Sequence, residues 1–196
     1  MITKVVARDM RNIDPDKPLP QIHHREIVAR SKLFRVEQVD LEFSNGATRQ
    51  FERMAGTNRG AVMIVPMLDA DTMILIREYA AGTHSYQLGF PKGLIDPGES
   101  PLEAANRELQ EEAGFGANEL HDIHQVSMAP TFFNATMNIV IARDLYEKRL
   151  PGDEPEPLEV VTWPVAEADA LLAREDFIEA RCIAALLLAQ KWLKEQ

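Results

Sequence analysis

The sequence predicts a mixed α/β fold in which strands surround one central helix and two further helices follow near the end of the chain. Three observations lead to this prediction. Apolar or alternating runs of strand length fill much of the first half, one sharply bounded helical pattern lies at the centre, and two amphipathic patterns follow residue 164. The chain has 196 residues, 45% of them hydrophobic, which is enough for one domain with a sizeable core and an additional arm.

The first third of the chain is expected to hold an arm and a hairpin. Residues 1–20 show no periodicity and are interpreted as a flexible arm. Residues 33–43 alternate apolar and polar side chains, Asn45-Gly46 is typical of a two-residue hairpin turn, and residues 48–54 supply the return strand.

These patterns divide the chain into three parts. After the arm we predict an antiparallel β-hairpin region over residues 21–57 and a larger second domain over residues 58–196. The apolar face of the hairpin needs a cover, so the hairpin is expected to form a dimer interface. We therefore expect a homodimer.

The second part is predicted to contain several strands and three helices. Residues 61–68 and 72–79 are apolar and separated by three residues, which predicts a pair of buried strands. The weaker strand patterns cover residues 84–90, 123–129, 136–145 and 160–163. The two helical patterns near the end cover residues 165–175 and 179–194.

The central helix has clear start and stop signals. Ser100 is a favourable N-cap, Pro101 suits the first helical position, and Glu103 completes a capping box. Ala113-Gly114 predicts the end, because glycine readily adopts the left-handed conformation that follows many helices.

Three carboxylates crowd one side of this helix. Residues three and four apart share a helical face, so Glu108, Glu111 and Glu112 project together, and Arg107 can brace one of them. In water-poor surroundings the carboxylates would repel each other strongly unless they take up protons or hold a cation. Such a density of oxygen ligands suits Mg²⁺ or Mn²⁺, with phosphate oxygens completing the shell.

The loop before the helix favours a binding site over a merely solvated acidic face. Residues 89–99 contain three glycines and two prolines, which predicts a tight loop whose backbone can approach a ligand closely. Glu99 adds a fourth carboxylate near the helix N-terminus, where the helix dipole favours negative charge.

The complete spacing resembles the Nudix box at every fixed position. Gly93 is followed by five residues, Glu99, seven residues, and then Arg107-Glu108-Leu109-x-Glu111-Glu112-x-Gly114-Phe115. The resemblance extends from about residue 25 to the end and is strongest to the members that hydrolyse ADP-linked compounds. It implies an α/β/α sandwich with a mixed sheet, plus an N-terminal antiparallel hairpin. It also implies metal-dependent cleavage of nucleoside diphosphates linked to another group.

The resemblance assigns roles to the residues of the box. Glu108 and Glu112 would ligate Mg²⁺ or Mn²⁺ directly, Glu111 would join them or position water, and the carbonyl of Lys92 would add a ligand. Arg107 would orient the glutamates, and Glu99 would support the loop or a further metal. The residues implied in catalysis are Glu111, Glu112, Arg107 and Glu99.

Several residues outside the box are candidates for substrate binding. Pro130 stands fifteen residues after Phe115, as a proline does in similar ADP-ribose pyrophosphatases, and Phe132 or its neighbour is a candidate to stack on adenine. Arg77, in the sequence "IREY", resembles a substrate-contacting arginine, although a surface ion pair with Glu78 or Asp71 would explain it equally well.

Glu52 and Arg53 end an N-terminal strand, and in similar dimers such residues reach the partner's pocket. The alternative is that both are solvated strand residues.

The general base remains open. Similar enzymes carry a glutamate in the loop after the conserved proline, but here Asn134 and Ala135 occupy that region, and no carboxylate lies between Pro130 and Arg143. The remaining candidates are Glu111 and three glutamates of the acidic loop, which we define as residues 151–159. These three are Glu154, Glu156 and Glu159.

The resemblance implies hydrolysis of ADP-ribose, NADH or diadenosine polyphosphates to AMP and a phosphorylated partner. One alternative is a Nudix-fold sensor that binds such a nucleotide without turnover, although the intact box speaks against it. Another is a hydrolase of other nucleoside diphosphate derivatives.

Composition excludes several other classes. The net charge of -10 speaks against nucleic acid as a partner. No segment approaches the roughly 18 apolar residues of a membrane span. The single cysteine, Cys182, cannot form an internal disulfide, so we expect a cytoplasmic protein.

Overall fold

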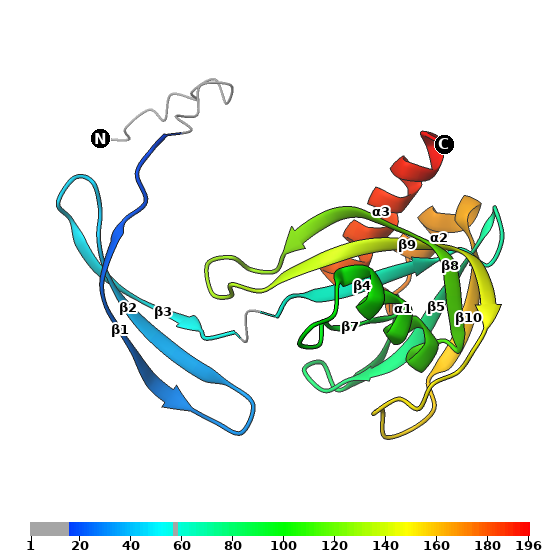
Figure 1. Ribbon diagram of the computed structural model, residues 1–196, viewed down its shortest axis with the longest axis horizontal. Coiled ribbons are helices and arrows are strands. Elements are labelled where there is room, and N and C mark those ends of the chain that lie inside the picture. The colour runs from blue at the N-terminus through cyan, green and yellow to red at the C-terminus, as the bar shows by residue number, and fades with distance from the viewer. Residues whose placement is uncertain (1–15, 57–58) are drawn as a thin grey trace. The chain divides into compact units, whose positions relative to one another are not determined.

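The computed structural model describes residues 16–56 and 59–196, which form two compact units (Figure 1). The first unit ends at Ala55 and the second runs from Gly56 to Gln196. Most of the arm expected over residues 1–20 lies outside the described residues, as does the expected boundary at residues 57 and 58. No helix in the described ranges is long and apolar enough to cross a membrane.

The first unit is a three-stranded antiparallel sheet with the strand order β1-β2-β3. Its strands are β1 (Gln21–Arg30), β2 (Arg35–Glu42) and β3 (Thr48–Met54). The hairpin of β2 and β3 is confirmed, but its turn is longer than expected, since the ladder closes at Glu42 and Thr48. Strand β1 was not predicted, because nearly all its side chains are exposed and it has no apolar alternation.

The second unit contains two sheets. A four-stranded sheet has the order β7-β4-β9-β8, and a three-stranded sheet has the order β10-β5-β6. Their strands are β4 (Ala61–Pro66), β5 (Thr72–Ala80), β6 (Ser85–Gly89), β7 (Lys92–Leu94), β8 (Phe115–Ser127), β9 (Thr136–Glu147) and β10 (Glu159–Pro164). The four-stranded sheet is mixed, because β4 pairs in parallel with β9 and antiparallel with β7.

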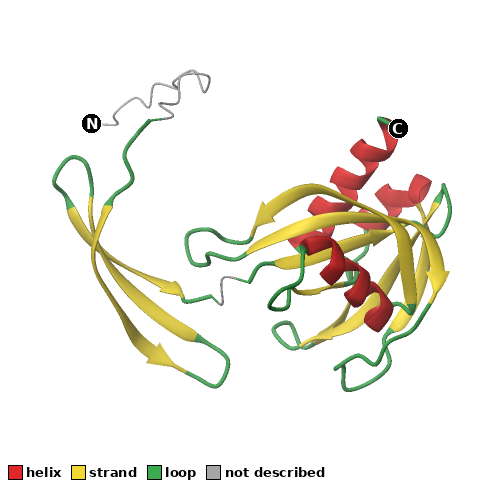
Figure 2. Ribbon diagram, in the orientation of Figure 1, coloured by secondary structure: helices red, strands yellow, loops and turns green. Residues whose placement is uncertain are grey.

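Helices cover both sides of the sheets, as an α/β/α sandwich requires (Figure 2). The helices are α1 (Pro101–Glu112), α2 (Ala168–Leu172) and α3 (Ala180–Lys194). Alternate residues of β4 serve two cores. Val62 and Ile64 pack in the cluster that contains Leu109 of α1, whereas Met63 packs in the cluster that contains Ala185 of α3. Strand β4 is therefore buried on both faces.

The structure corrects the expected pairing of the two apolar strands. β4 and β5 lie in different sheets, and an isolated bridge joins Met67, which follows β4, to Met73 of β5. Because both are buried on both faces, their apolar runs contain no alternation that could specify a partner strand.

Three other element predictions need correction. β8 begins directly after α1 and is longer than the expected strand at 123–129, and the short β7 was not predicted. The helix expected over residues 165–175 is a 3-10 turn, Val165–Glu167, followed by the short α2. The last helix is confirmed as α3.

Candidate active site

Helix α1 starts as its sequence predicts. The Ser100 hydroxyl accepts a hydrogen bond from the Glu103 backbone N–H at 3.3 Å, and the Glu103 carboxylate accepts one from the Ser100 backbone N–H at 2.8 Å. This capping box fixes the helix start, while buried Leu109 anchors the opposite side in the core. The start of the helix and its buried side therefore fix which way the carboxylates of Glu108, Glu111 and Glu112 project.

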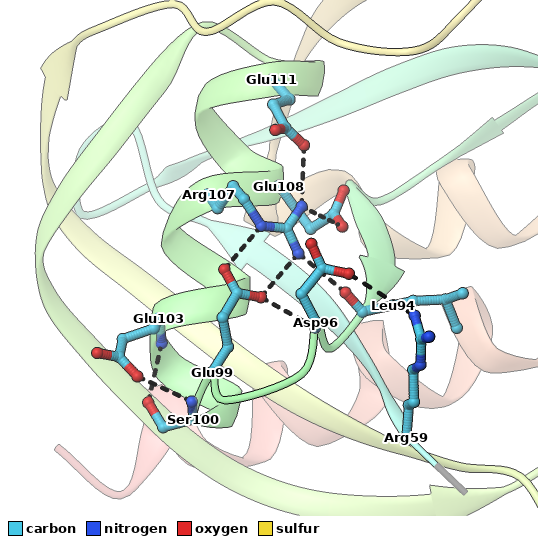
Figure 3. A network of polar contacts seen from close by, with 9 residues as sticks. All are labelled: Arg59, Leu94, Asp96, Glu99, Ser100, Glu103, Arg107, Glu108 and Glu111. Carbon is cyan, nitrogen blue, oxygen red and sulfur yellow. Dashed lines mark hydrogen bonds and ion pairs between the residues drawn. The ribbon is translucent and has the colours of Figure 1, made fainter. Parts of the chain in front are cut away.

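Arg107 organises three of the carboxylates (Figure 3). Its guanidinium makes two hydrogen bonds to Glu99, at 2.8 and 2.9 Å, and bonds Glu108 at 2.8 Å and Glu111 at 3.0 Å. A fifth hydrogen bond, at 2.9 Å, reaches the carbonyl oxygen of Leu94. All five N–H groups of the arginine are used, so it holds the loop and the helix together in one network.

This network stabilises the charged form of Glu99. The hydrogen bonds from Arg107 hold the pKa of the Glu99 carboxyl below its ordinary value, and the Asp96 backbone N–H adds to the effect. Arg107 was expected to brace one carboxylate of the helix. It contacts two on the helix and a third on the preceding loop.

Gly93 is required by the close approach of Glu108. A Cβ atom added to Gly93 would lie 2.0 Å from the carboxyl carbon of Glu108, so any side chain there would displace this carboxylate. Burial raises the pKa of Glu108 despite its contact with Arg107, and the nearby Glu111 and Asp153 raise it further. The glycine at the start of the box therefore leaves space for a carboxylate.

Burial raises the pKa of Glu112 strongly. It is 8% exposed and accepts a hydrogen bond from the Lys92 backbone N–H at 2.8 Å. Burial raises its pKa to about 8, because the attraction of Lys92 does not compensate for lost hydration and for the charges of Glu108 and Glu78. The Lys92 ammonium pairs with Glu78. The contact shown for Lys92 uses its amide, and the role of its carbonyl as a metal ligand stays a prediction.

These side chains line one cavity of about 620 Å³. Glu108, Glu111 and Glu112 lie on its wall, together with acidic groups of other elements. Those further acidic residues are Glu78, Asp96, Asp153 and Glu154. The cationic residues of the wall are Lys92, Arg107 and Arg181. Seven carboxylates thus face three cations, and the excess of negative charge is a setting that a divalent cation would relieve.

The donor set fits a hard divalent cation. Carboxylate oxygens are the ligands that Mg²⁺ and Mn²⁺ prefer, and the buried Glu112 has too little positive charge around it to stay ionised at neutral pH. In the present rotamers, no group of three acidic, His or Cys side chains among the described residues is close enough to hold an ion. Arg107 bonds one oxygen of Glu108 and one of Glu111, which leaves the second oxygen of each carboxylate for an ion.

The three glutamates of the acidic loop that are candidates for the general base have different surroundings. Glu154 lines the main cavity with Asp153, and burial together with the charges of Glu78 and Asp153 raises its pKa. Glu156 accepts a hydrogen bond from the Tyr86 hydroxyl and lines adjoining cavities only. Glu159 pairs with Arg77 at 3.4 Å. Of the candidates, Glu154 and Glu111 face the main cavity.

The expected substrate-binding residues of the second unit lie away from this cavity. Arg77 lies over the Tyr86 ring at 5.3 Å and lines an adjoining cavity of about 220 Å³, not the main one. Its ion-pair partner is Glu159, not the neighbours considered from the sequence. Pro130 is exposed and Phe132 is 57% exposed, and neither lines the main cavity.

Glu52 and Arg53 belong to β3 in the first unit. Arg53 pairs with Glu37 across the β-ladder at 2.7 Å. Their role toward a partner subunit stays a prediction.

Sequence reasoning missed three groups of the cavity wall: Glu78, Asp153 and Arg181. Each belongs to a different segment, namely β5, the acidic loop and α3. No spacing pattern links them to the box. The one available signal was the position of Glu78 directly after Arg77 in a strand already considered for substrate contact.

Comparisons with known proteins agree with this fold and site. The NUDIX domain model matches residues 57–186, and the model for the NudE-type Nudix hydrolase N-terminal domain matches residues 20–53. The chain therefore belongs to the Nudix hydrolase family.

Its relatives include the ADP compounds hydrolase NudE of Escherichia coli (strain K12), which is 63% identical over 90% of this chain and 95% of its own length. The ADP-sugar pyrophosphatase of Mus musculus is 31% identical over 89% of this chain and 84% of its own length. A crystal structure of an ADP compounds hydrolase superposes with a TM-score of 0.88 at 61% identity, covering 93% of this chain and 98% of that one.

Proposed function

We propose that this protein hydrolyses ADP-linked compounds to AMP and a phosphorylated partner, with Mg²⁺ or Mn²⁺ as cofactor. The observation that carries the proposal is the arrangement of Glu108, Glu111 and Glu112 on one cavity wall, tied by Arg107 to the loop that precedes the helix. The names of its relatives, which are hydrolases and pyrophosphatases of ADP compounds, support this choice of substrate class.

The proposed mechanism starts from the charge balance of the cavity. Glu108, Glu112 and the carbonyl of Lys92 would hold the cation, with Glu111 as a further ligand. Once bound, a divalent cation neutralises phosphate oxygens and promotes ionisation of the attacking water. Arg107 keeps the carboxylates oriented, and Glu99 anchors Arg107 through two hydrogen bonds.

The water needs an acceptor for its proton. Glu154 is our preferred general base, because it lines the main cavity and because burial and the charges of Glu78 and Asp153 raise the pKa of its carboxyl, which makes it a stronger proton acceptor. Glu111 is the second candidate. One of its oxygens accepts a hydrogen bond from Arg107 at 3.0 Å, which favours the charged form of the carboxylate over the protonated one.

The finer parts of the proposal concern substrates and assembly. ADP-ribose, NADH and diadenosine polyphosphates are all included, since each has an ADP moiety in a phosphoanhydride. A homodimer would allow Glu52 and Arg53 of one subunit to contact the substrate in the other. Arg77, Pro130 and Phe132 keep their predicted roles as substrate contacts outside the main cavity. A cytoplasmic location fits the single free cysteine.

The decisive experiment measures AMP release from ADP-ribose, NADH and diadenosine triphosphate with Mg²⁺, Mn²⁺ or EDTA. We expect release only with a metal ion, and Glu112→Gln should lower kcat by at least about a hundredfold, since it removes a charged ligand. Glu103→Gln is the matched control, because Glu103 lies on the same helix but outside the cavity. Tight binding of ADP-ribose without product after long incubation would instead establish a sensor.

A further inference from the structure

The main cavity contains three cationic side chains, and each of them pairs with at least one carboxylate. All five N–H groups of Arg107 bond to protein oxygens. The Lys92 ammonium is paired with Glu78 and lies beside Glu112. Arg107 therefore has no N–H left for a substrate phosphate, whereas the Lys92 ammonium uses one of its three N–H donors for Glu78.

Arg181 differs from both. It is the second residue of α3, its side chain is 24% exposed, and it lines the main cavity. Its Nε donates to Glu179 at 2.8 Å. Among the described residues, no hydrogen bond is recorded for its two terminal nitrogens, which form the edge of the guanidinium best suited to a phosphate.

Glu179 holds this arginine in place. One carboxylate oxygen of Glu179 accepts from Arg181 and the other caps α3 by accepting from the Cys182 backbone N–H at 3.0 Å. Helix α3 itself begins in close contact with β6, since the sulfur of Cys182 lies 3.0 Å from the position of a Cβ on Gly89. The guanidinium is therefore preorganised, which lowers the entropy cost of binding a ligand.

Arg181 lies at the end of the cavity formed by Lys92 and Glu78. These three residues line both the main cavity and an adjoining one of about 180 Å³. The adjoining cavity contains no residue of α1, so Arg181 borders space that the box carboxylates do not reach. The charged residues that line this adjoining cavity are Glu78, Lys92, Glu179 and Arg181, so Lys92 and Arg181 are the cations that a phosphate there would meet.

We propose that Arg181 is a specificity-determining residue that binds a further phosphate of the substrate, beyond the diphosphate served by the box, and so favours compounds with three or more phosphates. This inference rests on the proposed function for the position of the diphosphate. It assigns to α3 a contact that discriminates dinucleoside polyphosphates from ADP-ribose.

Binding of non-cleavable probes tests the inference without turnover. Dissociation constants for α,β-methylene-ADP and α,β-methylene-ATP are measured by calorimetry with Mg²⁺, for the wild type and for Arg181→Gln. Loss of one charge-assisted contact predicts a Kd about 10- to 100-fold higher for the triphosphate probe and a change below about threefold for the diphosphate probe. Arg181→Lys should recover part of the triphosphate affinity.

Arg174→Ala is the matched control, since Arg174 pairs with Asp176 outside the cavity and should leave both constants unchanged. In steady-state assays Arg181→Gln should raise KM for diadenosine triphosphate with little change in kcat, because the contact exists before and during reaction. Circular dichroism confirms that each variant is folded. If Arg181→Gln prevents folding, the same two constants for Arg181→Lys decide, with a selective loss expected, since lysine cannot form the paired contact.

Unchanged binding of the triphosphate probe, or an equal loss for both probes, would overturn the role of Arg181. A wild type that binds the probes but releases no AMP from any ADP-linked compound would overturn the proposed function instead. The binding comparison would then still decide the inference about Arg181.

Discussion

Because Glu112 is buried, we predict that the free energy of unfolding depends on pH even without substrate. The pKa of Glu112 is raised from 4.5 to about 8 in the folded protein. The folded chain therefore binds more protons than the unfolded chain between these two values, and its stability falls as pH rises through that window. A rise of this size corresponds to roughly 5 kcal/mol of lost stability above pH 8, since one pKa unit is worth about 1.4 kcal/mol.

Glu112→Gln should remove this cost in the metal-free protein. The amide has the same shape and can still accept the hydrogen bond from the Lys92 N–H. At pH 9 in EDTA we expect the variant to be more stable than the wild type by about 2–5 kcal/mol, the lower figure allowing for relaxation around the charge. At pH 4.5 the difference should nearly vanish.

Urea unfolding between pH 4.5 and 9, followed by the fluorescence of Trp163 and Trp192, measures the free energy of unfolding of the wild type and of Glu112→Gln at each pH. Glu103→Gln serves as the control, because Glu103 is exposed in the capping box and its replacement should leave the pH dependence in place. The reasoning would be refuted if Glu112→Gln retained the wild-type slope between pH 5 and 8, or if it were less stable at pH 9. Added Mg²⁺ should stabilise the wild type more than the variant, since binding to the folded state shifts its unfolding equilibrium.

Three further predictions concern the box and its support. Gly93→Ala should lower kcat at least about tenfold and reduce the free energy of unfolding by about 1–3 kcal/mol, because the new methyl displaces the Glu108 carboxylate. Steady-state kinetics and urea unfolding measure the two effects, and near-normal activity would contradict this account. Leu109→Ala should cost about 2–5 kcal/mol of unfolding free energy, since Leu109 is fully buried, and a loss below 1 kcal/mol by the same assay would show that the helix is not anchored there. Arg107→Lys should reduce kcat by about tenfold or more, because one ammonium cannot replace five directed N–H donors, and the pKa of Glu99, measured by NMR, should rise toward its ordinary value.

The helix and its charge pattern could be predicted because their determinants are local. The capping box joins residues three apart, and the glycine that follows α1 adopts a φ of 79° just where the sequence predicts an end. The Nudix spacing is also contained in a short stretch of chain, from Gly93 to Phe115. Hydrogen bonds over such short separations follow from residue type and helical periodicity alone.

The remaining parts of the site depend on chain segments that are far apart in sequence. Glu78 and Arg181 reach the cavity only because β5 and α3 assemble with α1 in the same unit, and no periodicity in either segment encodes that meeting. The same applies to the ladder of β1 and to the separation of β4 from β5, where partner choice depends on the assembled layers.

The sequence by itself determined the family, the capped helix and the set of carboxylates that crowd one side of it. Only the tertiary structure decided that all five N–H donors of Arg107 bond to protein oxygens and that Glu112 is buried. It also decided that Arg181 lines the cavity while its Nε bonds to Glu179. The physical reason is that burial and charge compensation are set by the neighbours a side chain acquires when distant elements pack together.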